Sequence, residues 1–191
     1  YNTAAWKRIG NVRLHLRTPV EQLVTNGGTI SGAIVKGELQ TADYYISSLP
    51  FERISTLVPN LGPDVSEFQH SPITGVHLWF DRTITQLPHA TVLDRTIQWV
   101  FNKSAGRYIQ VVISASRSLS DMPKNDVIAL VLKELAEFFP AVHGAKLEKS
   151  HVVKEIRATF SAKPGLDGLR PVAKTAFPNP LLAGGWVRSG C

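Results

Sequence analysis

A short apolar strand that ends at a pair of glycines, close to the C-terminus, constrains this chain most. Leu181-Leu182-Ala183 has the length and composition of a short buried strand, and Gly184-Gly185 follows directly. A glycine pair lets the backbone adopt a positive φ or approach a ligand closely, because no Cβ stands in the way. In α/β proteins a strand of this kind often brings backbone up to a cofactor. A plain strand ended by a turn is the alternative, which the pattern alone favours by about two to one.

A sheet-rich N-terminal block and a block of longer strands precede this segment in the sequence. The N-terminal block is predicted to be sheet-rich, with strands at Trp6–Leu16, Val20–Thr25, Thr29–Val35, Leu39–Ala42 and Asp43–Leu49. Asn26-Gly27-Gly28 is a strong signal for a hairpin turn between the second and third of these. A short helix with Pro50 at its first position is expected to end near Val58.

A change of composition at Pro59–Pro63 marks the first predicted domain boundary, and longer strands follow it. They are expected at Ser71–Asp81, Ile97–Asn102, Tyr108–Ala115 and Lys146–Phe160. In the first of these strands, alternation places Val76, Leu78 and Phe80 on one face. His77 and Trp79 lie on the other face. Asp81 and Arg82 are expected to form an ion pair at the strand end.

The clearest helix is predicted over Lys124–Phe139, capped by Ser120 or Asp121 and ended by Pro140. Its apolar stripe consists of Val127, Val131, Leu135 and Phe138.

Three segments resemble a known family. Pro178–Gly190 reads P-N-P-L-L-A-G-G-W-V-R-S-G, Ser71–Arg82 reads S-P-I-T-G-V-H-L-W-F-D-R, and Thr18–Leu23 reads T-P-V-E-Q-L. These segments are similar to motifs of the FAD-dependent amine oxidase and phytoene desaturase superfamily. The closest resemblance is to its squalene-associated desaturases, also called hydroxysqualene dehydroxylases, in which the C-terminal motif reads roughly P-N-L-F-L-A-G-D-W and later G-A-V-R-S-G.

The resemblance implies FAD as the cofactor and four cofactor-binding positions. The position of Val20 contacts the adenine through backbone groups, and Gly184, Gly185 and Trp186 belong to the flavin motif. Two departures stand out: Gly185 replaces an acidic residue that binds the ribityl chain, and the family's T-G-W-P-A-T segment is missing. The chain also has no G-x-G-x-x-G turn to hold the diphosphate. The chain alone is therefore expected to purify colourless.

The implied fold is an α+β fragment of a discontinuous α/β flavoprotein. Residues 1–63 form part of an FAD-binding domain, and residues 64–163 form a substrate domain with a mostly antiparallel or mixed sheet flanked by a helix. Residues 164–191 return to the first domain with the flavin motif. Because the chain opens at Tyr1 and closes on a motif, we expect it to be a piece of a longer protein.

The implied activity is that of an oxidoreductase acting on a C30 isoprenoid such as hydroxysqualene, in hopanoid and squalene biosynthesis. His77, Trp79 and Trp99 are the candidate substrate-binding residues. A hydrogen-bonded strand histidine is about three times likelier for His77, and strand aromatics are more often core residues. The histidines lack metal-ligand spacing, and no residue is assigned as a catalytic acid or base.

Alternative functions stay open at this point. A non-enzymatic remnant domain would bind an apolar isoprenoid or a partner chain. An oxidase of a polar amine would need an aromatic cage and acidic groups, and neither stands out in the sequence.

Composition bears on partners and location. The net charge of +6 is scattered, without a basic helix or an aromatic–basic stripe, so no nucleic-acid partner is expected. Association with an anionic membrane surface remains an alternative to a merely solvated surface, and no apolar run approaches the ~18 residues of a membrane span. A single cysteine, Cys191, favours a reducing compartment. We therefore expect a cytoplasmic protein, with a peripheral position at the inner membrane as an option.

Overall fold

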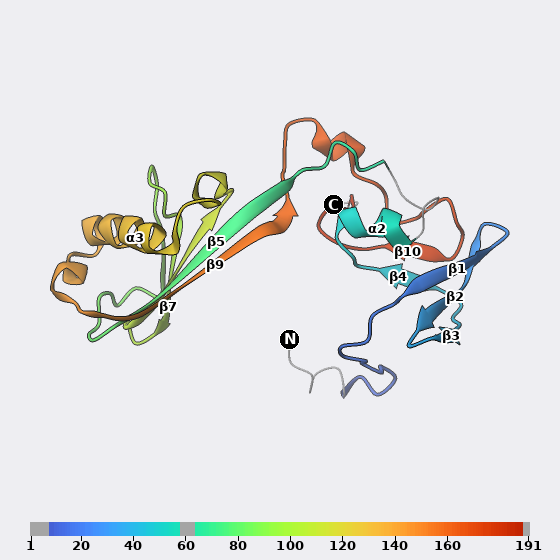
Figure 1. Ribbon diagram of the computed structural model, residues 1–191, viewed down its shortest axis with the longest axis horizontal. Helices are drawn as coiled ribbons and strands as arrows, with labels where there is room; N and C mark the ends of the chain where they lie inside the picture. Colours follow the sequence, from blue (N-terminus) through green and yellow to red (C-terminus); the bar gives the residue numbers. More distant parts are fainter. Residues whose placement is uncertain (1–7, 58–63, 189–191) are drawn as a thin grey trace. The chain divides into compact units, whose positions relative to one another are not determined.

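The computed structural model describes residues 8–57 and 64–188 of the 191-residue chain (Figure 1). The described residues up to Glu67 and from Lys163 onward form one compact unit, and Phe68–Ala162 form a second. We call them the first and the second unit. The boundary predicted at Pro59–Pro63 lies outside the described residues. The two units are described separately below.

A three-stranded antiparallel sheet opens the first unit. It consists of β1 (Gln22–Asn26), β2 (Thr29–Val35) and β3 (Glu38–Gln40), in that order. Gly27 and Gly28 join β1 to β2 with φ values of 55° and 81°, a turn that suits the twist of two paired strands. The hairpin predicted from Asn26-Gly27-Gly28 is confirmed.

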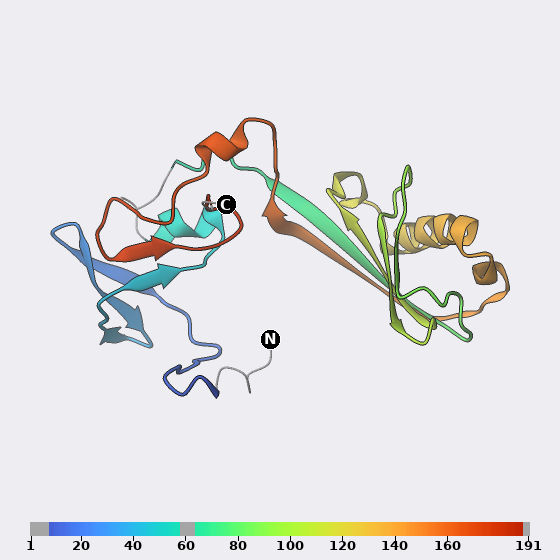
Figure 2. The same cartoon turned by 180° about the vertical axis from the view of Figure 1, so that it is seen from behind.

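A parallel strand pair joins the two ends of the chain in the first unit. Here β4 (Tyr45–Ser47) pairs with β10 (Pro180–Leu182), and α2 (Phe51–Leu57) follows β4 (Figure 2). The strand predicted over Asp43–Leu49 is thus shorter than expected, and Ile46 is 71% exposed rather than buried. Among the described residues β4 has a strand neighbour on one edge only.

The strand predicted over Trp6–Leu16 is wrong for the part that the structure describes. Residues 12–15 have no regular structure, and Leu14 and Leu16 are 51% and 67% exposed. An alternating sequence becomes a strand only where another strand accepts its hydrogen bonds, and within the described residues this segment has no such partner.

The second unit is an antiparallel five-stranded sheet with the order β6-β7-β8-β5-β9. Its strands are β5 (His70–Phe80), β6 (His89–Thr91), β7 (Trp99–Ser104), β8 (Tyr108–Ser114) and β9 (Leu147–Phe160). The four long strands were predicted, although β7 begins at Trp99 rather than at Ile97. The three-residue β6 was not predicted, because it is too short to show a period.

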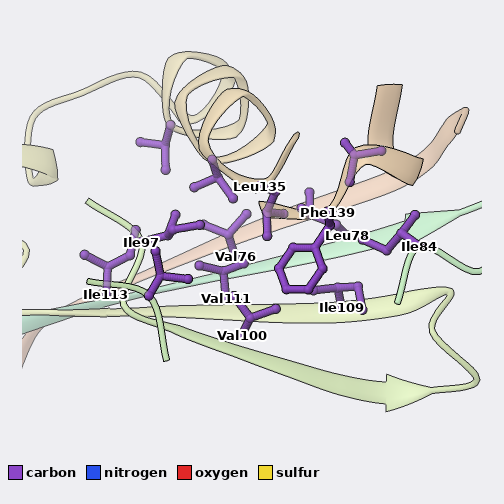
Figure 3. Close-up of a cluster of buried hydrophobic side chains, with 14 of the residues drawn as sticks. Val76, Leu78, Ile84, Ile97, Val100, Ile109, Val111, Ile113, Leu135 and Phe139 are labelled. Atoms are coloured by element: carbon purple, nitrogen blue, oxygen red, sulfur yellow. The ribbon is translucent and has the colours of Figure 1, made fainter. Parts of the chain in front are cut away.

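The core of the second unit lies between one sheet face and helix α3 (Lys124–Phe138), as Figure 3 shows. Val76 and Leu78 on β5 and Val111 on β8 are fully buried, as the alternation predicted. Val127, Val131 and Leu135 on α3 are fully buried as well. Each such side chain contributes roughly 1.5–3 kcal/mol through burial. Phe138, predicted as the fourth member of the stripe, is 44% exposed.

The predicted cap of α3 at Ser120 or Asp121 is wrong. Pro123 occupies the cap position without a side-chain bond, and its carbonyl accepts the backbone N–H groups of Asp126 and Val127. The side chain of Lys154 on β9 donates hydrogen bonds to the carbonyls of Ser120 and Met122. This segment is therefore fixed from the sheet rather than by a local cap.

Asp81 and Arg82 form the predicted ion pair at the end of β5, with Arg82 Nη2 2.9 Å from Asp81 Oδ2. The hydrogen bond from Arg82, followed by that from the Lys146 N–H, lowers the pKa of Asp81 to about 2. None of the helices in the described part of the chain is long and apolar enough to cross a membrane.

Candidate functional site

A pocket of about 750 Å³ lies within the first unit. Val20 contributes to its wall from the segment before β1, and β4 and α2 supply other parts, including Ile46 and Arg53. Val20 is 44% exposed, so its backbone and side chain both border open space. Of the four candidate cofactor positions, the structure places only Val20 in this pocket.

Gly184, Gly185 and Trp186 form a turn directly after β10 and do not line the pocket. Trp186 is buried, and its indole N–H donates to the carbonyl of Leu49 over 3.0 Å. Leu49 lies in the pocket wall, so Trp186 supports the wall from outside. The carbonyl of Gly185 accepts a hydrogen bond of 3.0 Å from Arg170, which also donates to the Val187 carbonyl over 2.6 Å.

The side chain of Asn179 joins this C-terminal segment to β2. Its Oδ1 accepts the N–H of Ile30 over 3.0 Å, and its Nδ2 donates to the carbonyl of Ile30 over 2.7 Å. The backbone carbonyl of Asn179 accepts the N–H of Tyr45 at the start of β4. One side chain thus ties the three-stranded sheet to the β4–β10 pair.

These residues fit part of an FAD molecule. The pocket is large enough for a planar ring system, and its apolar wall of Val20, Ile46 and Leu49 suits the adenine. A diphosphate needs several convergent backbone N–H groups, and within the described residues no glycine-rich strand-to-helix turn supplies them. The first unit can therefore hold the nucleotide end of the cofactor only in part.

The second candidate region is the sheet face of the second unit that points away from α3. We call it the open face. Strand registers place these side chains on it: Gly75, His77, Trp79, Trp99, Phe101, Tyr108, Gln110, Val112, Lys149, His151 and Val153. Aromatic and aliphatic groups dominate it, and Trp99 and Val153 are 43% and 44% exposed. An apolar face of this kind suits an apolar ligand.

His77 and Trp79 lie side by side on the open face, towards the C-terminal end of β5, with ring centroids 6.2 Å apart. The Nδ1 of His77 lies 2.9 Å from the hydroxyl of Tyr108. The ring of Tyr108 stacks on that of Trp79, with centroids 4.5 Å apart and planes inclined by 11°. The ammonium of Lys149 lies 4.9 Å from the Trp79 ring centroid, and His151 lies 6.3 Å from His77 between ring centroids.

Trp99 lies two strands away from His77, on β7, and stacks on Phe101 with centroids 6.4 Å apart. All three candidate substrate residues therefore share one face but form two clusters. Burial, followed by the charges of His151 and Lys103, lowers the pKa of His77. Among the residues described, no three metal-ligating side chains gather here or elsewhere.

Sequence reasoning missed Tyr108, Gly75 and Lys149. Alternation with Ile109 and Val111 assigns Tyr108 to the face opposite the core, so the sequence could show the face of the sheet on which Tyr108 lies. The strand order and register, which bring Tyr108 beside Trp79, are set by tertiary pairing and do not show in a single sequence.

Comparison with known proteins places these features in a family. The model of the flavin containing amine oxidoreductase family matches residues 2–191. A hydroxysqualene dehydroxylase of Sinorhizobium fredii is 30% identical over 148 residues, which are 78% of this chain and 34% of that protein. A 15-cis-phytoene desaturase of Synechococcus elongatus is 24% identical over 199 residues, which are 90% of this chain and 42% of that protein.

Solved structures share the fold at low identity. An L-proline dehydrogenase from P. horikoshii has a TM-score of 0.65 at 11% identity and covers 94% of this chain and 46% of its own. An oxidoreductase from Methanosarcina mazei has a TM-score of 0.65 at 17% identity, with 90% and 44% covered. The chain spans less than half the length of each of these proteins. With its mixed, mostly antiparallel α+β architecture and a match across residues 2–191, it belongs to the flavin containing amine oxidoreductase family.

Proposed function

We propose that this chain is part of an FAD-dependent oxidoreductase that acts on a C30 isoprenoid, of the hydroxysqualene dehydroxylase and squalene-associated desaturase type. The family match over residues 2–191 carries the proposal. Relatives whose names refer to phytoene and hydroxysqualene support an isoprenoid substrate. The aromatic open face supports the same class, because a long hydrocarbon gains most of its affinity from burial of apolar surface.

The proposed roles follow the two units. Val20 and the surrounding pocket hold the adenine end of FAD, and the turn of Gly184, Gly185 and Trp186 approaches the flavin end. His77, Trp79 and Trp99 bind the isoprenoid. Flavin bound in its reduced form would supply the hydride equivalent that such a reaction needs, in which a C–O bond breaks and the hydroxyl leaves with a proton as water. The protein supplies an apolar surface and orientation.

The substrate also bears on where the protein works. A C30 hydrocarbon partitions into membranes, so a protein that takes it up benefits from contact with a membrane surface. The net charge of +6 favours such contact with an anionic inner membrane. We therefore propose a cytoplasmic protein that associates peripherally with this membrane and has no nucleic-acid partner.

An FAD titration of the purified chain tests the cofactor part of the proposal. We expect a colourless protein that binds added FAD weakly but saturably in equilibrium dialysis. Val20→Phe, which places a larger side chain at the pocket wall, is expected to weaken this binding at least several-fold. Val172→Phe is the matched control, because Val172 is 48% exposed and does not line the pocket. Absence of saturable binding up to about 1 mM FAD, or equal effects of the two variants, would contradict the assignment.

A further inference from the structure

His77 presents one ring nitrogen to the open face while the other is occupied. The Tyr108 hydroxyl engages Nδ1 at 2.9 Å. Among the described residues no hydrogen-bond partner reaches Nε2. A neutral imidazole with one nitrogen occupied has one donor or acceptor left to offer a ligand.

Tyr108 is held in position by residues on the strands beside it in the sheet. Tyr108 and Trp79 are partners in the register of β8 and β5, and their rings are stacked at 4.5 Å. Lys149 is the register partner of Trp79 on β9, and its ammonium lies over the Trp79 ring, 4.9 Å from the ring centroid. This stack holds the Tyr108 hydroxyl against Nδ1, so the imidazole of His77 is oriented before any ligand arrives.

Gly75 leaves an opening beside Nε2. It precedes His77 by two residues on β5 and therefore lies on the same face. A Cβ at Gly75 would meet only the His77 Nε2, at 3.8 Å, and no other atom within 4 Å. The register partners of Gly75 are Val112 and Val153, so aliphatic side chains border the opening on both sides. A small polar group that enters it meets Nε2 between two valines, with Gln110 and His151, the register partners of His77, as the nearest polar side chains along the strands.

We propose that His77 Nε2, in the opening over Gly75, recognises the hydroxyl group of an isoprenoid alcohol, and that Tyr108 is its positioning residue. This rests on the proposed function and deepens it by naming the residues that recognise the hydroxyl of the substrate. A hydroxyl that leaves water for an apolar surface needs a partner, and Nε2 is placed to be that partner. A hydrocarbon such as squalene has no group for this site.

The electrostatic surroundings keep His77 able to play this role. The basic groups around it are His151 and Lys149 on β9 and Lys103 on β7, and Tyr108 is the titratable group on β8. Burial, followed by the charges of His151 and Lys103, lowers the pKa of His77 and so favours the uncharged imidazole. An uncharged ring accepts or donates a hydrogen bond without the desolvation cost of a buried cation.

The test compares hydroxysqualene with squalene at the 191-residue chain in the same detergent micelles, with tryptophan quenching as the readout. We expect hydroxysqualene to bind roughly 2- to 10-fold more tightly, the range of one hydrogen bond. His77→Phe is expected to abolish the difference and to leave squalene affinity unchanged. Gly75→Ala is expected to do the same, because the added methyl group occupies the opening. His143→Phe, at an exposed position outside the open face, is the matched control.

A second measurement separates recognition from structural damage. In a chain with 15N-labelled histidine, hydroxysqualene is expected to shift the Nε2 resonance of His77, whereas squalene leaves it in place. Tyr108→Phe keeps the ring stack and removes the hydroxyl, so we expect it to change the balance between the two neutral His77 tautomers and to reduce the preference for the alcohol.

The outcomes distinguish the two proposals. Equal binding of both ligands, with no Nε2 shift, overturns the hydroxyl site and leaves the isoprenoid surface intact. Binding of neither ligand overturns the open face as a substrate surface and the hydroxyl site with it. A preference for the alcohol that survives in both His77→Phe and Gly75→Ala shows that the hydroxyl is recognised elsewhere.

Discussion

Gly184 has a φ of 138°, a backbone conformation that residues with a Cβ rarely adopt. A Cβ there would lie 3.2 Å from Nε1 of Trp186, the atom that donates to the Leu49 carbonyl. The sequence pattern allowed either a positive φ or a close approach to a ligand at the glycine pair, and Gly184 has the positive φ. Within the described structure, the close approach that the glycine permits is to an indole of the same chain.

We expect Gly184→Ala to lower the free energy of unfolding of the first unit by roughly 1–3 kcal/mol, the cost of one strained backbone residue. Urea unfolding followed through the indole N–H resonance of Trp186 measures it. Gly168→Ala is the control, because a Cβ there meets nothing within 4 Å and its backbone is unstrained. The control is expected to stay within about 0.5 kcal/mol of the parent. Equal losses in the two variants would show that the conformation of Gly184 is not the reason.

Other single-residue roles were beyond sequence reasoning. The sequence identified Asn179 only as part of the C-terminal motif and gave no role for it. Its side chain forms hydrogen bonds with both the backbone N–H and the carbonyl of Ile30, 149 residues away. A separation of this size leaves no local signal, since a local pattern reports only on neighbours within a few positions. His77 and Trp79 could be assigned to one face from alternation, but the partner Tyr108 depends on register.

Helices and strands with a clear hydrophobic periodicity were predicted well where the chain also provides a neighbouring strand or sheet for them to pack against. β5 and β8 alternate cleanly and pair with each other, and α3 has a continuous buried stripe. The segment before β1 alternates equally well but has no strand beside it in the described structure, and it is exposed. Periodicity predicts which face is apolar, and burial additionally requires a partner.

The helix α3 holds its neighbouring loop through a buried carboxylate that no pattern signalled. Glu134 accepts the N–H of Ile97 over 2.8 Å and that of Thr96 over 3.2 Å, and only 8% of the residue is exposed. Glu137, one turn later, pairs with Arg95 at 2.8 Å, where both side chains are about 40% exposed. The two carboxylates differ chiefly in burial.

We therefore expect unequal effects from the same substitution. Glu134→Ala leaves two backbone N–H groups unpaired and is expected to lower the free energy of unfolding of the second unit by roughly 1–3 kcal/mol. Glu137→Ala removes an exposed ion pair and is expected to cost less than about 1 kcal/mol. Urea unfolding of both variants by circular dichroism measures the difference. A larger loss in Glu137→Ala would contradict this account of the loop.

At the scale of the molecule, the second unit is a continuous stretch of chain with its own core. All buried members of the main hydrophobic cluster, from Val76 to Val152, belong to it. The sheet, its covering helix and the loop held by Glu134 all lie between Phe68 and Ala162. The change of pattern along the sequence predicted a substrate domain over residues 64–163, which stays a prediction, and the strand order could not be read from single-strand signals.

We expect residues 68–162, expressed alone, to fold cooperatively. Circular dichroism, a single urea transition and a dispersed amide NMR spectrum are the measurements. Val131→Asp is the control, since a charge in the centre of the core is expected to abolish the transition. If the excised segment shows no cooperative urea transition and no dispersed amide spectrum, the core needs residues from the first unit.

The pairing of β4 with β10 has a consequence for the time course of synthesis. Leu49 and Trp186, which bond beside this pair, are 137 residues apart. At roughly 5–20 residues per second, a ribosome needs about 7–27 s to add the residues between them. During this interval the residues of the second unit are synthesised, and β4 remains without its parallel partner β10. The partners of β1, β2 and β3 are therefore available early in synthesis, whereas β4 gains its partner only after the whole second unit has been made.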